Sequence, residues 1–523
     1  MTTDREAIAR SAGTIGGITL LARVTGLARD VVTAGFFGTG LAMSAFVVAF
    51  TIPNLLRNLL GEGALTGAFV PVFTEWLRKK GRGESLRLAN IVFSILGLIL
   101  AGLVVAGWLS VGLWSRLFPL SEKFELVSRL LLVMMPFLFF ICLAALAMGI
   151  LHGFRRFAVP AFAPIALNLV WIGAVLFLCP LFGAGLERRI FGLAWGIVLG
   201  GALQLLIHLP SLRREGFRLS FDLDLRHPAV RRIALLTAPG VLGLAFVQLN
   251  VVLDKFLALL ISPQAPSTLF FANRLVQFPL GLFGIALATA SLPVLSAQAA
   301  EKKMGEFKLT FSYVLRATFL ITIPSAVGLI VLRRPIVRLL FQRRAFDAAS
   351  TEATAWVVMF YALGLLAFAG SKITTQAFHS LQDTKTPVKV GLAAMAVNLV
   401  LNLLVVFQPF LRASLREGGL ALSTSLVSFL SFGALLYLLR RRLGPLRGRE
   451  ILFGLLRVCA AAAVMGAVGA FCLSRFDLLR LPPGFARDLA EVAVPVAASL
   501  LAFFLAGILF RVREIRELCR AFR

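Results

Sequence analysis

Long apolar runs alternate with short polar segments along the whole chain of 523 residues. Two of these runs are IVFSILGLILAGLVVAGWLSVGLW, which begins at Ile91, and LLLVMMPFLFFICLAALAMGI, which begins at Leu130. A helix needs about 20 residues to cross the hydrocarbon core of a bilayer. The pattern therefore predicts an all-α polytopic membrane protein with about fourteen transmembrane helices.

Composition and charge agree with this class. The chain is 59% hydrophobic and carries a net charge of +28, but its basic residues fall in the short connections between apolar runs. A soluble nucleic-acid-binding domain would gather them on one face, so no nucleic-acid partner is expected. The positive-inside rule instead places both termini and the most basic connections in the cytoplasm. These connections include Arg78, Lys79, Lys80 and Arg82; Arg213, Arg214 and Arg218; and Arg440, Arg441, Arg442, Arg447 and Arg449.

Three features of the sequence need a separate interpretation: a basic stretch, the first apolar run and the cysteines. The basic stretch from Arg333 to Arg344 falls on the opposite side by this count, and we expect an amphipathic segment on the outer surface. The first apolar run has no small-residue cleavage site, so it reads as an uncleaved first span. The cysteines lack C-x-x-C spacing and mostly lie in apolar runs, which predicts packing residues and neither disulfides nor a metal site: Cys142, Cys179, Cys459, Cys472 and Cys519.

The two halves of the chain resemble each other at an offset of roughly 222 to 230 residues. Pro71 aligns with Pro293, and Gly192-Leu193-Ala194 aligns with Gly419-Leu420-Ala421. His152 before Asn168 likewise matches His379 before Asn398. We expect two six-helix lobes, residues 1–215 and 216–445, with a substrate cleft between them. Residues 446–523 would then hold two further helices and a basic cytoplasmic C-terminus.

Charged residues interrupt the first apolar run, which reads LARVTGLARD from Leu21 to Asp30. An arginine inside a bilayer is costly and usually faces a partner or a water-filled cavity. Arg23 and Arg29 would point about 120° apart on a straight helix, and Gly26 would permit a bend or local unwinding that lets them converge. The alternative is that either arginine extends to the membrane interface.

Two further arginines, Arg57 and Arg274, lie at comparable depth in the second and eighth predicted spans. With only Asp30 and Glu62 as acidic neighbours, the four arginines would leave the cleft positively charged. A guanidinium group binds phosphate in bidentate fashion, so the pattern favours a phosphorylated anion as substrate. Prolines and glycines around Arg57 and after Arg274 predict that both spans are bent.

A second polar set lies in the other half: Asp254, Asn398, Asn402 and Thr424. Asn398 and Asn402 are four residues apart and share a helix face. Carboxylate, amide and hydroxyl oxygens suit a hard cation such as Na⁺. The alternatives are polar contacts between helices or an Asp254–Lys255 pair near the outer end.

Catalytic interpretations are weak. Asp222-Leu223-Asp224 has the D-x-D form of some metal-dependent glycosyltransferases, but it lies in a short basic loop that we expect to be solvated. The four histidines have no metal-ligand spacing, and no nucleophile–base pair stands out. The sequence predicts a transporter and not an enzyme.

Four segments resemble the signatures of the MurJ (MviN) family of lipid II flippases. They are RVTGLARD from Arg23, IPNLLRNLLGEGALTGAFVPVF from Ile52, ANRLVQFPLGLFGIALATASLPVLS from Ala272 and LQDTKTPVK from Leu381. The resemblance runs across nearly the whole chain. It implies the MOP exporter fold in the bacterial inner membrane. It also implies movement of undecaprenyl-pyrophosphate-linked peptidoglycan precursor, lipid II, to the periplasmic leaflet by alternating access.

The resemblance also assigns roles to particular residues. The family's cavity arginines, which would hold the pyrophosphate, fall on Arg23, Arg29, Arg57 and Arg274, with Asp30 and Glu62 as the acidic cavity residues. The sodium ligands of some members match Asp254, Asn398, Asn402 and Thr424, although one member has Asp in place of Asn402. Ser44, Asn273 and Gln277 stand where certain members are acidic, so coupling through those positions is not expected.

The resemblance further implies that the last two spans form a groove for the polyprenyl tail, that Na⁺ is a candidate coupling ion and that no other cofactor is needed. Membrane lipids and the cell-wall synthesis machinery are the expected partners besides lipid II. Two alternatives stay open. One is a related MOP-type exporter of another polyprenyl-linked oligosaccharide or of drugs, and the other, more remote, is an enzyme acting on the same lipid.

Overall fold

Helices make up every regular element in the described part of the computed structural model. The structure describes residues 2–117, 121–281, 285–476, 482 and 484–515. Their contacts divide the chain into two units, residues 1–256 (unit 1) and 257–523 (unit 2), and the boundary falls inside one helix, α8. The division into lobes at residue 215, with a separate segment from residue 446, stays a prediction.

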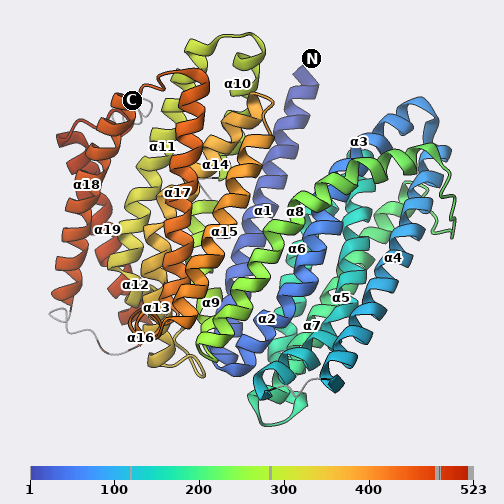
Figure 1. Ribbon diagram of the computed structural model, residues 1–523, viewed down its shortest axis with the longest axis horizontal. Coiled ribbons are helices and arrows are strands. Elements are labelled where there is room, and N and C mark those ends of the chain that lie inside the picture. The colour runs from blue at the N-terminus through green and yellow to red at the C-terminus, as the bar shows by residue number, and fades with distance from the viewer. Residues whose placement is uncertain (1, 118–120, 282–284, 477–481, 483, 516–523) are drawn as a thin grey trace. The chain divides into compact units, whose positions relative to one another are not determined.

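Unit 1 is built around α5, whose apolar sequence is buried along most of its length because α2, α4 and α7 pack against it (Figure 1). The helix α6 packs on α7 and also against α1. The helices that begin in this unit are α1 (Thr2–Phe37), α2 (Leu41–Arg57), α3 (Ala64–Lys79), α4 (Gly81–Leu117), α5 (Glu122–Gly153), α6 (Ala158–Gly173), α7 (Leu186–Arg214) and α8 (Pro228–Ile261), and α8 ends in unit 2.

Unit 2 has a core of large apolar side chains from α11, α14, α17 and α18, and α19 packs along α18 (Figure 1). Its helices are α9 (Ala265–Pro279), α10 (Ile285–Ala300), α11 (Met304–Val331), α12 (Arg333–Phe341), α13 (Ala348–Leu363), α14 (Leu365–Ser380), α15 (Lys385–Phe407), α16 (Pro409–Leu415), α17 (Gly418–Leu443), α18 (Gly448–Ser474) and α19 (Phe485–Leu509).

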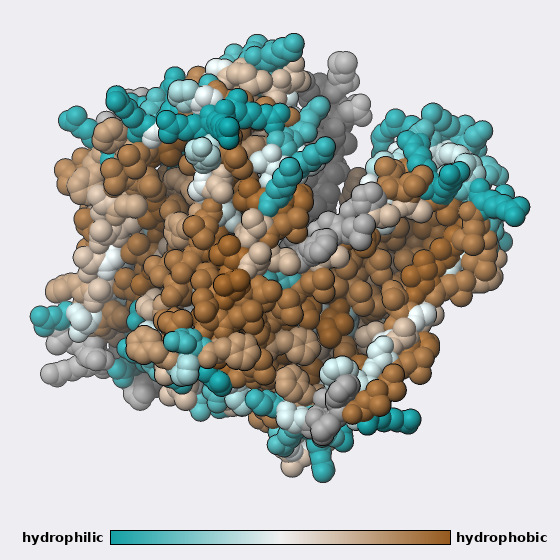
Figure 2. Space-filling model, viewed as in Figure 1, coloured by the Kyte–Doolittle hydropathy of each residue, from teal (hydrophilic) through white to brown (hydrophobic). Residues whose placement is uncertain are grey.

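Ten helices among the described residues are long and apolar enough to cross a membrane, and a bent pair, α13 with α14, brings the number to eleven. Figure 2 shows hydrophobic surface along the helices of each unit and hydrophilic residues at the helix ends. The 36-residue α1 and the 34-residue α8 are not among the ten, although both exceed the length that a bilayer requires. A multi-span helical membrane protein is therefore confirmed.

Two of the predicted bent spans contain π-helical turns. In unit 1, residues Asn58–Gly63 form a π-helix directly after Arg57, between α2 and α3. In unit 2, Leu280 and Gly281 are π-helical after α9. A π-turn loosens the regular hydrogen-bond ladder and often lies at a functional site. The glycines and prolines that predicted irregular helices therefore mark where the winding changes.

The basic segment from Arg333 forms the short helix α12, as its amphipathic sequence predicts. Pro335, Val337 and Phe341 are buried, and the exposed Arg334 and Arg338 pair with Glu352 and Glu491. The amphipathic helix is confirmed, and its location on the outer surface stays a prediction.

Candidate substrate-binding site

The guanidinium group of Arg29 is held by its neighbour Asp30, in the middle of unit 1's first helix. Both Nε and Nη2 of Arg29 donate to Oδ1 of Asp30, over 2.9 and 2.7 Å. The two side chains are 12% and 7% exposed. A pair this buried loses most of its hydration, so its geometry depends on hydrogen bonds from other helices.

Helix α6 supplies those bonds through Asn168 and Trp171. Nη1 of Arg29 donates to Oδ1 of Asn168 over 3.1 Å, and the guanidinium carbon lies 4.5 Å from the centre of the Trp171 ring. Asn168 in turn donates to the carbonyl of Ala22 and to the hydroxyl of Thr25. The cation is thereby fixed between a carboxylate, an amide and an aromatic face.

Gly26 does not interrupt its helix. The helix α1 continues from Thr2 to Phe37, so the local unwinding that Gly26 would permit is absent. A Cβ atom at this position would lie 3.6 Å from Nδ2 of Asn168, which is an ordinary van der Waals contact. The intact helix keeps Arg23 and Arg29 on different faces.

The other predicted cavity residues of unit 1 are less enclosed. Arg23 is exposed, which fits the alternative in which this side chain extends to an interface. Arg57 is half-buried at the end of α2, and its Nη2 donates to Asn58 over 3.4 Å at the start of the π-helix. The side chain of Glu62 lies outside the described residues.

Arg274 belongs to unit 2, on α9. Its side chain is exposed, and the guanidinium carbon lies 4.9 Å from the centre of the Phe270 ring. On the same helix, the side-chain amide of Gln277 donates a hydrogen bond to that of Asn273 over 3.1 Å. These are the two amides at which the sequence predicts no charge coupling. Arg23, Arg29 and Arg57 belong to unit 1, and the convergence of all four arginines on one cavity stays a prediction.

Three of the four predicted sodium ligands lie in unit 2. Asn398 and Asn402 are buried one turn apart on α15, and Nδ2 of Asn402 donates to Oδ1 of Asn398 over 3.1 Å. Thr424 lies on α17, which packs against α15, and its hydroxyl donates to the carbonyl of Leu420. The threonine oxygen keeps its lone pairs, so the donor set suits a hard cation. Asp254 belongs to unit 1.

The aspartates of the D-x-D segment and the cysteines lie outside this candidate site. Asp222 and Asp224 form ion pairs with Arg87, with N–O distances of 3.2 and 3.5 Å, and they tie their loop to α4. Within the described residues no group of three or more His, Cys, Asp or Glu side chains could hold a metal ion. No disulfide joins the four described cysteines, Cys142, Cys179, Cys459 and Cys472, and Cys519 lies outside this part of the chain.

Comparison with known proteins decides the family. The family model described as "Lipid II flippase MurJ" matches residues 33–481. The chain belongs to the MurJ family. It is 34% identical to the lipid II flippase MurJ of Burkholderia cenocepacia over 502 residues, which are 94% of each chain. It is 37% identical to the probable lipid II flippase MurJ of Vibrio cholerae over 435 residues, 81% of each chain.

Solved structures agree with this family. A lipid II flippase MurJ in an inward closed conformation superposes with a TM-score of 0.77 at 25% identity, over 95% of this chain and 98% of the other. An inward-facing multidrug resistance MATE family transporter of the MOP superfamily gives 0.64 at 15% identity, over 84% and 99%. The second similarity shows the shared fold only.

The sequence singled out the charged residues of the candidate site, but it did not point to Asn168 and Trp171 as their partners. Asn168 was noticed only as a landmark of the internal repeat, because its partner Arg29 is 139 positions away. The signal that was available is a lone amide in the apolar run AVPAFAPIALNLVWIG of α6. A buried amide needs hydrogen-bond partners on other helices.

Proposed function

We propose that this chain moves lipid II, the undecaprenyl-pyrophosphate-linked disaccharide-pentapeptide, from the cytoplasmic to the periplasmic leaflet of the bacterial inner membrane. Membership of the MurJ family carries the proposal, because the Burkholderia cenocepacia relative named as a lipid II flippase matches 94% of each chain. The work is transport by alternating access, and the chain is a transporter and not an enzyme.

The pyrophosphate of the substrate would bind the cavity arginines, Arg23, Arg29, Arg57 and Arg274, with Asp30 and Glu62 as their acidic neighbours. Arg29 is suited to this role because its bonds to Asp30 and Asn168 engage three N–H groups, and a guanidinium group has five. The remaining two N–H groups can donate to phosphate oxygens without breaking the existing contacts. The positive charge is thus positioned before the substrate arrives.

Neutralisation of these arginines by the pyrophosphate would permit the transporter to close toward the cytoplasm and open outward. The π-helical turns after Arg57 and after α9 lie where the helices would change their winding. After release, the cavity is again positive. An inside-negative membrane potential favours the return, since one charge moved through 100 mV changes the free energy by about 2.3 kcal/mol.

The long polyprenyl tail would lie along the last two described helices. A cavity of about 400 Å³ is lined by α11, α18 and α19, with Pro324, Met465 and Phe503 among its apolar residues. In the family-derived arrangement, about fourteen spans form two six-helix lobes and these two helices stand outside them. Both termini would be cytoplasmic.

Na⁺ is the candidate coupling ion, held by Asp254, Asn398, Asn402 and Thr424. The close pair of buried asparagines and the neighbouring threonine supply oxygen ligands of the class that Na⁺ prefers. The cell-wall synthesis machinery, which consumes lipid II in the periplasm, is the proposed protein partner.

The test is complementation. The full chain would be expressed in bacteria depleted of their own lipid II flippase, and lipid II accessible in the outer leaflet would be measured, with Arg29→Ala alongside. Arg78→Ala is the control, because Arg78 is an exposed arginine at the end of α3. We expect accessibility to be restored by the wild type and the control and lost in Arg29→Ala. A well-inserted wild type that restores nothing would overturn the proposed function.

A further inference from the structure

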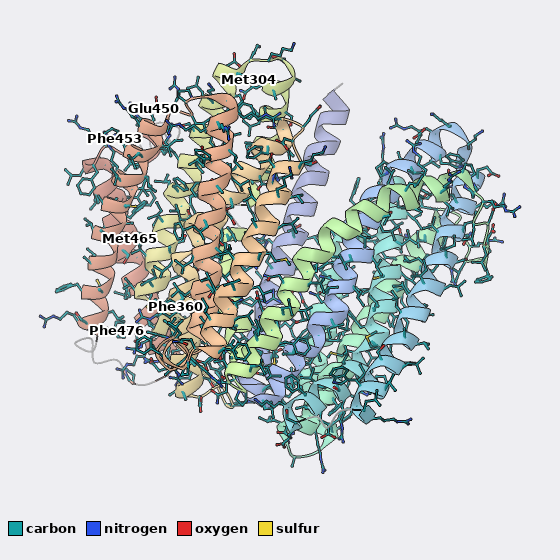
Figure 3. The ribbon with its side chains drawn as sticks, in the orientation of Figure 1. Met304, Phe360, Glu450, Phe453, Met465 and Phe476 are labelled. Carbon is teal, nitrogen blue, oxygen red and sulfur yellow. The ribbon has the colours of Figure 1, made fainter. Side chains whose placement is uncertain are left out.

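A second large cavity in unit 2 is lined by residues of α11, α14, α17 and α18 and differs from the proposed tail groove. Its volume is about 790 Å³, inside the range of roughly 300–1,000 Å³ that ligand pockets occupy. It lies at the beginning of α18, where Figure 3 labels Glu450 and Phe453, whereas Met465 of the tail groove lies further along the helix.

The deep wall of this cavity is apolar. Its side chains include Phe319 of α11, Leu366 of α14, Phe432 and Leu436 of α17, and Ile451 and Leu455 of α18. Leu452 also lines the cavity, and its side chain is 53% exposed. The next residue, Phe453, does not line the cavity and is 57% exposed. The cavity therefore lies beside exposed apolar side chains of α18, a predicted membrane span.

The rim is basic. Arg440, Arg447 and Arg449 line it together with one carboxylate, Glu450. Arg447 is paired with Glu450 over 2.9 Å, whereas the side chains of Arg440 and Arg449 form no ion pair or hydrogen bond to any other described residue. Two exposed guanidinium groups thus stand at the mouth of an apolar cavity. Figure 2 shows hydrophilic residues along this end of unit 2 above a hydrophobic surface.

We propose that this cavity binds an anionic two-chain glycerophospholipid, with its phosphate on Arg440 and Arg449 and one acyl chain inside the apolar wall. Charge complementarity selects the occupant, because a zwitterionic lipid would bring a second cation to an already basic rim. Basic pockets between transmembrane helices commonly bind anionic headgroups. The positive-inside rule predicts that this loop is cytoplasmic, so the lipid would come from the cytoplasmic leaflet. The site is separate from the cavity arginines.

The binding test uses the purified full chain in detergent, titrated with dioleoyl phosphatidylglycerol and with dioleoyl phosphatidylcholine and followed by native mass spectrometry. We expect tighter binding of phosphatidylglycerol. Arg440→Gln with Arg449→Gln should weaken it about twenty-five-fold, since each arginine near an anionic headgroup contributes roughly fivefold. Arg440→Lys with Arg449→Lys keeps both charges and should retain most of the binding.

Two controls make the result specific. Arg213→Gln with Arg441→Gln removes the same charge from exposed positions that do not line the cavity, and Arg29→Ala alters the candidate substrate site; both should bind phosphatidylglycerol normally. Leu455→Trp fills part of the apolar cavity but keeps the arginines, and it should weaken the binding of phosphatidylglycerol, as the Gln variant does. Free glycerol phosphate should not compete, because it lacks the acyl chains.

Several outcomes would overturn the proposal. They are equal binding of the two lipids, equal losses in the Arg213/Arg441 control, competition by glycerol phosphate alone, and unchanged binding in the correctly folded Gln variant. Binding of a polyprenyl phosphate in place of phosphatidylglycerol would assign the cavity to the substrate tail instead. Because the readout is phospholipid binding, none of these results depends on whether the chain transports lipid II.

Discussion

Arg29 can remain charged inside a helix because three side chains share the cost of its burial. An arginine at the centre of a membrane helix costs about 2.5–3.5 kcal/mol on insertion scales. Asp30 offsets the charge, Asn168 accepts a hydrogen bond, and the Trp171 ring lies 4.5 Å from the guanidinium carbon. Removing one partner leaves the others buried and unmatched, which costs more than the contact itself contributes.

Asn168→Ala tests this arrangement. The variant loses the bond to Arg29 and the bonds to Ala22 and Thr25, so we expect the free energy of unfolding to fall by about 1–3 kcal/mol. We also expect lipid II transport per folded molecule to fall about tenfold or more, because Arg29 is no longer fixed in position. The measurements are thermal unfolding in detergent and outer-leaflet lipid II in the depleted strain.

The matched control is Asn90→Ala. Asn90 is also a buried asparagine of unit 1, but its side chain accepts a hydrogen bond from the backbone N–H of Ser220, in the loop between α7 and α8. We expect a similar loss of stability and normal transport after correction for abundance. Equal transport in the two variants would show that Asn168 is only a structural residue.

At the element scale, two glycines of the internal repeat mark close helix contacts. A Cβ on Gly192 of α7 would lie 2.6 Å from the backbone of Cys179, and a Cβ on Gly419 of α17 would lie 2.5 Å from the side chain of Val405. In each unit, therefore, a glycine near the start of a helix lets another segment approach it closely. Close helix packing therefore explains why both halves of the sequence have a glycine at this position of the repeat.

Gly192→Ala should be more destabilising than Gly419→Ala. The backbone of Cys179 cannot move aside, whereas the Val405 side chain can rotate, so we expect losses of about 3 and 1 kcal/mol, within the usual range for overpacking. The control is Gly97→Ala, since a Cβ there would meet nothing within 4 Å, and better helix propensity should make it neutral or stabilising. Thermal unfolding of the three variants in detergent gives the ranking, and the reverse order would contradict the packing argument.

The loop between α14 and α15 gives a pH-dependent prediction. The backbone N–H of Thr386 donates to Asp383 and lowers the pKa of that carboxyl from its ordinary 3.8, and the Thr386 hydroxyl and Arg442 lower the pKa further. A lowered pKa in the folded state stabilises the fold above the unfolded pKa, and this is lost as pH falls through the folded value. Asp383→Asn keeps an oxygen that can accept from Thr386 but loses the charge that pairs with Arg442, so it should be less stable than the wild type at pH 7 by about 0.5–1 kcal/mol.

The difference in stability between the wild type and Asp383→Asn should shrink when unfolding is measured well below pH 3.8. The wild-type carboxyl is then protonated and, like the amide of the variant, carries no charge. Asp488→Asn is the control, since this acidic residue in the first turn of α19 has no ion pair with another described residue. A destabilisation of Asp383→Asn that stays constant across this range would rule out the charge as its cause.

The sequence predicted individual helices better than the contacts between helices. The run of arginines from Arg333 predicted an amphipathic segment, which forms α12, and the glycines and prolines near Arg57 predicted that this part of the chain is bent, where a π-helix lies between α2 and α3. Both signals are local. At Gly26 the helix stays intact, and Asn168 of α6 donates to Ala22 and Thr25 beside it. This contact joins residues that are far apart in the sequence, so no local signal could predict it.

At the scale of the whole molecule, apolar runs predicted a polytopic helical protein, and ten or eleven described helices meet the requirements for a membrane span. The expected count of about fourteen used windows of apolar residues, and it also included α1, where Arg23, Arg29 and Asp30 interrupt the apolar run. The arginines that lower the hydropathy of α1 are among those that we propose bind the substrate. A residue needed for binding can therefore hide a membrane span from a hydropathy criterion.

The membrane potential should act on the transporter through the cavity arginines. An inside-negative potential of 100 mV changes an equilibrium by about 2.3 kcal/mol, or roughly fiftyfold, for each full charge that crosses the field. We expect transport of a fluorescent lipid II in proteoliposomes to rise with a potassium-diffusion potential. The voltage dependence should weaken in Arg274→Gln and be retained in Arg274→Lys, which keeps the charge. Arg78→Gln, an exposed position at the end of α3, should behave as the wild type. If Arg274→Gln keeps the full voltage dependence, Arg274 does not carry the charge on which the potential acts.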